Sequence, residues 1–447
     1  MLSYNHQMIT EKALNYVHNN GLINITYSGT ANIKNQNDSF NNLEIAAGIH
    51  ESAQAGTGTF SVAGNLTIDS GAQFTDGLTA ATGDIISVSD DVYVSGILNM
   101  SASGENEDHK FETLVIQSGA VYSATSGLTN LTGTSGTVFD NNAGSTGYVH
   151  NGGTINIGYN LYGGDAIFYN LQNDLTTLYV RENITVINYM NHTSGQFQFM
   201  SSSTTNLGNS SQAGTFSAGA GVSTVQPWTS TIQGADQSYP AVINGGNWWW
   251  GRAGTKTFKW VNFTINLDLD DTTTTDQALS LGGDVDFARF TTTSSYVLDL
   301  NDYHATFSDY ITMTGNITGT GNMTLQSGAS TINNLANFTK TTIDSGASLT
   351  LGTNSLTTFT DVVGAGFDGT GTLTATGTSG NEATIQSAGT TNWDVNSSAL
   401  TETFNYANVA YGNNTGLDII YVYNGTDSGN NIPEGMWVFN NPAAPDN

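Results

Sequence analysis

The amino-acid sequence predicts an all-β protein with the fold of a right-handed parallel β-helix, or β-solenoid. The first observation is an internal repeat: residues 16–25 read YVHNNGLINI and residues 148–157 read YVHNGGTINI, with eight of ten letters identical. The second is a turn unit that recurs as IDSGA at Ile68, IQSGA at Ile116, LQSGA at Leu325, IDSGA at Ile343 and a weaker IQSAG at Ile385. Intervals of 18, 42 and 48 residues between these units fit one or two coils of about 18–24 residues.

Composition is the third observation. With 38% hydrophobic and 10% charged residues, 52 Gly and only 5 Pro, the chain is too apolar and too weakly charged for a disordered protein. Its polar residues are mainly Thr, Ser and Asn, which suit β-faces and turns better than helix interiors. These values favour short strands joined by glycine-rich turns.

The predicted strands follow the repeat in a constant order. The first copy is followed by SFNNLEI (39–45) and FSVAGNLTIDSGAQF (60–74), and the second by IFYNLQN (167–173) and VRENITVINYMNHTSGQF (180–197). Alternation predicts inward apolar side chains in these strands and in the later LQSGA region. The residues expected to point inward are Val62, Leu66, Ile68, Met323, Leu325 and Ile332. A β-sandwich remains the structural alternative, although it predicts no regular recurrence of one turn unit.

The series YVHNNG, SFNNLEI, GNLTIDSGAQF and TDSGNNIPEGMWVFNNP resembles the β-helical repeats of large bacterial and archaeal cell-surface and secreted, adhesin-like proteins. This resemblance implies a right-handed parallel β-helix, often followed by further modules. It implies an extracellular or cell-surface location and specifies fold more than activity. The N-terminal sequence MLSYNHQMITEKALNYV lacks the apolar run of a signal peptide, which departs from this expectation.

One segment interrupts the pattern of repeat units and suggests the domain organisation. Residues 226–256 match no repeat unit and contain two of the five prolines, so we expect an irregular Trp-rich junction or a lateral loop there. The prediction is a first β-solenoid block over 1–225 and a second over 257–432. Residues 433–447 resemble a linker-like tail.

Charge and cysteine content exclude several classes of protein. The chain has 9 Lys+Arg against 37 Asp+Glu, a net charge of −28, so it lacks the basic surface that nucleic-acid binding requires. It contains no cysteine, which excludes disulfides and thiolate metal sites. No run of about 18 apolar residues predicts a membrane span, so we expect no direct membrane insertion. The remaining partners are cations, neutral glycans and other protein surfaces.

Aromatic residues in the interrupting segment suggest a glycan-binding site. Trp248, Trp249 and Trp250, with Arg252 beside them, would form a platform on which sugar rings stack. The simpler interpretation is strand alternation, in which Trp248 and Trp250 pack on one side and Trp249 lies on the other.

Acidic residues in the run LDLDDTTTTDQ are the best candidates for a metal site. Asp268, Asp270, Asp271 and Asp276 supply the oxygen ligands that Ca2+ prefers, but no calcium-loop pattern follows them. A solvated acidic edge is therefore favoured, and no other cofactor is predicted. The acids and the histidine of GENEDHKFE and SDDVY are interpreted as loop charges; these are Asp90, Asp91, Glu105, Glu107, Asp108 and His109.

Fifteen N-x-[ST] sequons are about as many as chance gives in a chain so rich in Asn, Ser and Thr. Many lie on the strand motif itself, where asparagine amides are expected to hydrogen-bond from one coil to the next. The candidates for N-glycosylation are Asn24, Asn65, Asn183, Asn262, Asn322 and Asn424.

The sequence therefore predicts an extracellular structural or surface protein, a β-helical stalk or filament segment for adhesion or self-assembly. Its partners are expected to be other copies of itself or neighbouring domains of a longer chain. The alternative is a tailspike-like β-helix that binds or cleaves glycans. Enzymatic activity is not favoured, because no carboxylate pair or basic cluster forms a recognisable catalytic motif.

Overall fold

The protein, seen in a computed structural model, is a β-solenoid of stacked parallel strands, as predicted. Parallel pairing of strands from successive turns excludes the β-sandwich alternative, and the antiparallel pair β24–β25 is a local exception. The chain divides into two compact units, Met1–Val225 (unit 1) and Gln226–Asn447 (unit 2). The residues that the structure describes are 2–3, 21–33, 39–52, 58–76, 84–101, 107–174, 177–200, 202–227, 230–235, 241–245, 256–259, 261–263, 268–269, 277–281, 284–292 and 296–441.

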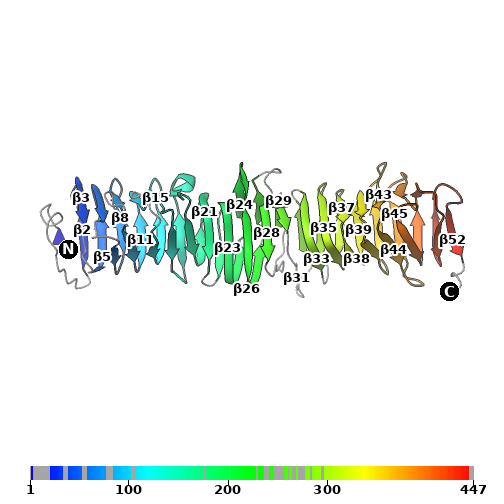
Figure 1. Ribbon diagram of the computed structural model, residues 1–447, viewed down its shortest axis with the longest axis horizontal. Coiled ribbons are helices and arrows are strands. Elements are labelled where there is room, and N and C mark those ends of the chain that lie inside the picture. Colours follow the sequence, from blue (N-terminus) through cyan, green and yellow to red (C-terminus); the bar gives the residue numbers. More distant parts are fainter. Residues whose placement is uncertain are drawn as a thin grey trace. The chain divides into compact units, whose positions relative to one another are not determined.

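Unit 1 has three faces, and through most of it each turn contributes one strand to each face (Figure 1). The first face stacks β2 (Leu22–Ile25), β5 (Asn42–Ile45), β8 (Leu66–Ile68), β11 (Asp91–Val94), β14 (Thr113–Ile116), β17 (Thr137–Asn141), β20 (Tyr159–Tyr162) and β22 (Leu178–Val180). The second face stacks β3 (Thr30–Ile33), β6 (Ile49–Ser52), β9 (Gln73–Thr75), β12 (Ile97–Asn99), β15 (Val121–Ser123) and β18 (Tyr148–Val149).

The third face of unit 1 leads into longer strands near its C-terminal end. It stacks β4 (Ser39–Phe40), β7 (Thr59–Val62), β10 (Ile85–Val88), β13 (His109–Phe111), β16 (Leu128–Leu131), β19 (Thr154–Ile157), β21 (Ala166–Asn173) and β23 (Ile184–Phe199). The remaining elements are β1 (Leu2–Ser3), a 3-10 helix (Gly144–Thr146), β24 (Thr204–Asn209), β25 (Gln212–Ala213) and β26 (Thr215–Pro227), which crosses the boundary.

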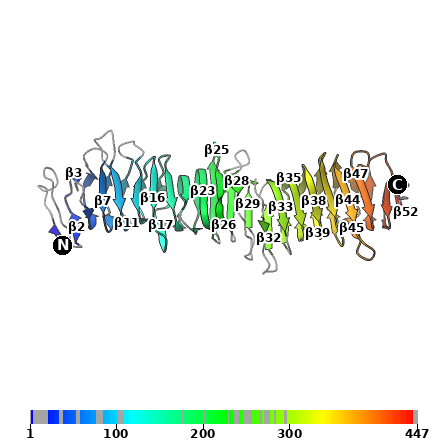
Figure 2. The ribbon, with the colours of Figure 1, turned by 60° about the horizontal axis from the view of Figure 1, so that its bottom comes forward.

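Unit 2 repeats the three-faced arrangement (Figure 2). Its first face stacks β27 (Thr231–Gly234), β29 (Lys256–Lys259), β32 (Gln277–Leu281), β34 (Tyr296–Asp299), β36 (Asn316–Thr318), β39 (Leu335–Phe338), β42 (Leu356–Phe359), β45 (Ala383–Ser387), β48 (Ala407–Ala410) and β51 (Thr426–Gly429). Its second face stacks β28 (Ala241–Gly245), β30 (Val261–Phe263), β33 (Val285–Thr292), β35 (His304–Met313), β37 (Asn322–Leu325), β40 (Lys340–Ile343), β43 (Gly366–Gly369), β46 (Trp393–Val395) and β49 (Gly412–Asn414).

The third face of unit 2 begins at β31 (Asp268–Leu269) and uses the C-terminal parts of β33 and β35. It continues through β38 (Gly328–Ile332), β41 (Ala347–Leu351), β44 (Thr372–Thr376), β47 (Thr401–Asn405), β50 (Ile420–Tyr423) and β52 (Trp437–Asn441). Strands also occur in the predicted Trp-rich junction and in the predicted linker-like tail. The strands β27 and β28 lie within 226–256, and β52 lies within 433–447.

Inward side chains form columns wherever stacked strands keep the same register. On the first face of unit 1 the column Ile25, Ile45, Ile68, Val94 and Ile116 ends on the buried amide of Asn141. The six residues that the sequence predicts to point inward, from Val62 to Ile332, are all buried, which confirms that expectation. Alternation within each strand therefore determines the core.

Coil length varies more than the sequence suggests. Register partners are 16 residues apart at Ile155 and Leu171 but 29 residues apart at Leu373 and Glu402. Both intervals fall outside the predicted 18–24 residues. The strands keep their pairing, so the turns between them absorb the difference in length.

Candidate functional site

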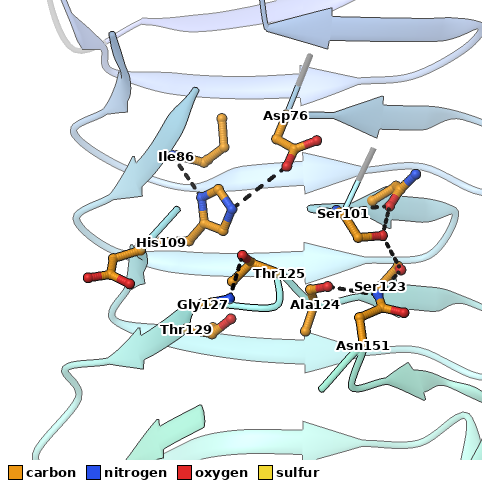
Figure 3. A network of polar contacts seen from close by, with 12 residues as sticks. Asp76, Ile86, Ser101, His109, Ser123, Ala124, Thr125, Gly127, Thr129 and Asn151 are labelled. Carbon is orange, nitrogen blue, oxygen red and sulfur yellow. Dashed lines mark hydrogen bonds and ion pairs between the residues drawn. The ribbon is translucent and has the colours of Figure 1, made fainter. Parts of the chain in front are cut away.

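A histidine and a carboxylate from different turns meet inside unit 1. His109, the first residue of β13, is 0% exposed, and Asp76, which follows β9, is 1% exposed. Nε2 of His109 lies 3.9 Å from Oδ2 of Asp76 (Figure 3). The backbone N–H of Ile86 donates to Nδ1 of His109 at 3.0 Å. Because Nδ1 accepts this bond, the proton of the neutral ring is assigned to Nε2, the atom nearest Asp76.

Burial determines the protonation of this group of residues. Loss of solvent lowers the pKa of His109 to about 4, so its ring is uncharged at neutral pH. Thr129 is the register partner of His109 in the next turn, and its hydroxyl lies 2.9 Å from the hydroxyl of Tyr122. Burial raises the pKa of Tyr122 for the same reason. We call Asp76, His109, Tyr122 and Thr129 the buried polar cluster.

The buried polar cluster contains residue types that serve in acid–base catalysis. All four members are at most 1% exposed, so a substrate in solvent cannot contact them in this state. We therefore interpret the cluster as part of the core. The interpretation of His109 as a loop charge is wrong: in the strand HKF, alternation turns His109 and Phe111 inward and leaves Lys110 exposed.

A ladder of polar side chains lies near this cluster, where strands of the second face end. The hydroxyl groups of Ser101 and Ser123, on neighbouring turns, are 3.0 Å apart. Nδ2 of Asn151 donates to Oγ of Ser123 and to the carbonyl oxygen of Ala124, both at 2.8 Å (Figure 3). Three successive turns are thus joined by side chains in addition to their backbone pairing.

The third face of unit 2 carries a regular outward column of threonines. Five of them are register partners on successive strands from β35 to β47, and none is buried. Adjacent members are about 4.8 Å apart, the spacing of paired strands. We call these residues the threonine column; they are Thr312, Thr331, Thr350, Thr374 and Thr403.

The aromatic and acidic sites predicted from sequence lie largely outside the described residues. Trp248, Trp249, Trp250 and Arg252 are not among them, and neither are Asp270, Asp271 and Asp276. The backbone of Asp268 begins β31 and pairs with Thr291. Within the described residues, no group of three or more His, Asp or Glu side chains could hold a metal ion. The glycan and Ca2+ sites therefore remain predictions.

Two of the six candidate glycosylation asparagines hydrogen-bond to neighbouring turns through their Nδ2 atoms. Nδ2 of Asn24 donates to Oε2 of Glu44 at 2.7 Å, and Nδ2 of Asn424 donates to Oδ1 of Asn405 at 3.1 Å. The Asn424–Asn405 bond confirms for this residue the predicted pairing of amides between coils. Nδ2 is also the atom that glycosylation would modify.

The other four candidate asparagines differ in their environment. Oδ1 of Asn65 accepts the backbone N–H of Asp91 at 3.2 Å, and Oδ1 of the exposed Asn183 accepts that of Thr204 at 2.8 Å. Asn322 is partly exposed on β37, and the backbone of Asn262 lies in β30. Glycosylation of these residues remains a prediction.

Comparison with known proteins gives no further guide to function. The chain matches no protein-family model, no curated protein and no solved structure. Among the described residues, no helix is long and apolar enough to cross a membrane. Function must therefore be argued from the geometry of the solenoid.

Proposed function

We propose that the chain is an extracellular or cell-surface structural protein, a β-solenoid segment of a stalk or filament that serves adhesion or self-assembly. The observation that carries this proposal is the threonine column. Over five turns it offers the same short, uncharged side chain at a regular spacing, which suits repeated contact with an equally regular surface. Another copy of this chain is such a surface.

Charge supports a contact on this face. The chain carries a net charge of −28, so copies repel one another wherever their acidic surfaces approach. The neighbouring outward column on the same face is also uncharged, with Ala329, Ser348, Thr372 and Thr401 as register partners. Association through these two columns would avoid the closest approach of carboxylates.

The arrangement of ionisable groups gives little support to an enzyme. The histidine and carboxylate nearest each other in the described residues, His109 and Asp76, are buried. Glu402 has a pKa raised to about 7 by burial, with a smaller contribution from the charge of Asp418. Among the described residues, no hydrogen bond or ion pair joins its side chain to a second acidic or basic side chain. Acid–base hydrolysis of glycans needs two carboxyl groups at a defined separation.

Mass photometry over a concentration series, combined with electron microscopy of the native assembly, tests the proposal. We expect oligomers or filaments of the wild-type chain at micromolar concentration. The double variant T350E/T374E should reduce association, because it places like charges in the middle of the threonine column. The matched control is T324E/T342E, which alters register partners on the second face of the same unit.

A chain that stays monomeric at all concentrations, or two double variants that associate equally, would overturn self-assembly through the threonine column. Surface location is tested separately, by protease treatment of intact cells that express the protein. Protection of the protein from external protease until the cells are lysed would contradict the proposed location.

A further inference from the structure

An arginine on the first face of unit 1 is held between two tyrosine rings. The parallel strands β20 and β22 pair Asn160 with Tyr179, and the backbone N–H of Arg181 then donates to the carbonyl oxygen of Leu161 at 2.9 Å. Arg181 therefore continues the ladder beside Tyr162. Tyr162, Tyr179 and Arg181 are all partly exposed. We call Asn160, Tyr162, Tyr179 and Arg181 the Arg181 cluster.

Contacts within the cluster fix the guanidinium group. Its carbon atom Cζ lies 5.7 Å from the centre of the Tyr162 ring and 5.5 Å from that of Tyr179. Both distances are within the range of cation–π attraction. Nε donates to Oδ1 of Asn160 at 2.6 Å, and Asn160 is itself 8% exposed. The side chain is thus oriented before any ligand arrives, which lowers the entropy cost of binding.

The terminal nitrogens of Arg181 carry N–H groups that donate to no side chain among the described residues. Among the described residues no carboxylate lies within 4 Å of them, and the bond from Nε is the only side-chain hydrogen bond that the arginine makes there. The adjacent acid, Glu182, instead accepts the backbone N–H of Gly164 at 2.9 Å. Arg181 is the only arginine in residues 1–225 of this strongly acidic chain. A surface arginine that served only stability would be expected to pair with one of the many carboxylates.

We propose that the Arg181 cluster binds a sugar acid. The ligand carboxylate would accept two parallel hydrogen bonds from the terminal nitrogens of Arg181, the geometry that a guanidinium offers and an ammonium does not. The apolar face of the sugar ring would lie against the exposed part of Tyr162 or Tyr179. The ligand site does not depend on the threonine column or on assembly.

Charge narrows the class of ligand. The net charge of −28 opposes a densely charged polyanion such as a nucleic acid. Salt screens this repulsion beyond about 8 Å at physiological ionic strength, so an isolated carboxylate within a mainly neutral glycan meets little of it. The site therefore fits a glycan in which acidic sugars are spaced apart by neutral ones.

Ligand-observed NMR titration of the full chain tests the proposal, with methyl glucuronide as the probe and methyl glucoside as its neutral counterpart. We expect millimolar binding of the glucuronide and binding of the glucoside that is weaker by about tenfold or more. The variant R181Q should lose most of the glucuronide binding. R181K keeps the charge and the aliphatic stem but lacks the planar fork, so it should bind less tightly than wild type.

The control is K340Q, which removes a cation of unit 2 that pairs with Asp368 at 2.8 Å. It should bind like the wild type. Thermal melting checks that each variant is folded. If R181Q does not fold, the comparison of R181K with the wild type tests the proposal. Equal binding by wild type and R181K, equal binding of glucuronide and glucoside, or equally tight binding of acetate would each overturn recognition of a sugar acid by this cluster. Failure of the glucuronide to bind the wild type would do the same.

Discussion

Asp76 and His109, 33 positions apart in the sequence, lie in the core of unit 1 with Oδ2 and Nε2 3.9 Å from each other. The backbone bond from Ile86 to Nδ1 holds the imidazole in place. A neutral histidine is therefore part of the packed interior, and folding is linked to its protonation. This linkage gives the first prediction.

We expect unit 1 to lose stability in acid through His109. Burial lowers the pKa of His109 from 6.5 to about 4, so the unfolded chain binds a proton more readily than the folded one between these values. The contribution is present above pH 6.5 and is lost as the pH falls through about 4, and its full size is about 3 kcal/mol. The slope of unfolding free energy against pH, from urea denaturation followed by tyrosine fluorescence and circular dichroism, measures it.

The variant H109Q should reduce this slope, since glutamine does not titrate, even if it lowers stability at every pH. Part of the slope should remain, because burial also lowers the pKa of His192 in unit 1 to about 4. H304Q, at a partly exposed histidine of unit 2, is the control. An unaltered acid slope in H109Q would contradict the assignment.

Glu402 gives the opposite pH dependence in unit 2. It is the register partner of the buried Leu373, so it occupies an inward position at the edge of the core. Burial raises the pKa of Glu402 to about 7 from 4.5, with a smaller contribution from the negative charge of Asp418. The stability that this group contributes is present below pH 4.5 and is lost as the pH rises through about 7.

We expect E402Q to be more stable than the wild type at pH 8, by on the order of 1–2 kcal/mol after allowance for solvent screening, and similar to it at pH 4. Tryptophan fluorescence is a suitable probe, because all seven tryptophans lie in residues 226–447. The control is E382Q, a partly exposed glutamate of the same unit. A gain of stability that is equal at both pH values would refute the role of ionisation.

Two glycines with left-handed backbones offer a matched test of close packing between turns. Gly346 has φ +88 and open space where a Cβ would lie, whereas Gly369 has φ +105 and would bring a Cβ against the backbone of Ile343. G346A should cost about 1 kcal/mol of unfolding free energy from backbone strain alone. G369A should cost clearly more, since the chain must also move. Equal losses in chemical denaturation would show that the turns do not approach as closely as described.

Removal of divalent metal should leave the fold intact. The acidic run from Asp268 to Asp276 lacks a calcium-loop pattern, so we expect the melting temperature to be the same with and without a chelator. A fall of tens of degrees on chelation would show that this region holds a structural ion. Substitution D268N should then reproduce the fall.

Alternation within strands could be predicted from the sequence because it depends only on local order. The inward positions of Val62, Leu66 and Ile68 follow from a period of two, and all three are at most 1% exposed. The repeated turn units likewise predict stacked coils. These features require no knowledge of how one turn is aligned with the next.

Register between turns could not be predicted, because the number of residues per coil varies. The buried contact between Asp76 and His109 joins different turns, and so does the contact between Tyr162 and Arg181. A change of one residue in the alignment would turn each side chain to the opposite side of its sheet. The candidate sites of the described residues were therefore visible only in the structure, whereas Trp249 and Asp270 remain predictions from sequence.

The variable length of the turns allows such a chain to accept insertions during evolution. Coils of 16 and of 29 residues coexist with unbroken strand pairing, so insertions at the corners leave the neighbouring strands aligned. A segment grafted at a corner would be displayed to solvent at little cost to the core, since the entropy of closing a longer loop grows slowly with length. The solenoid can therefore acquire new recognition loops one corner at a time, while the faces between the corners keep their spacing.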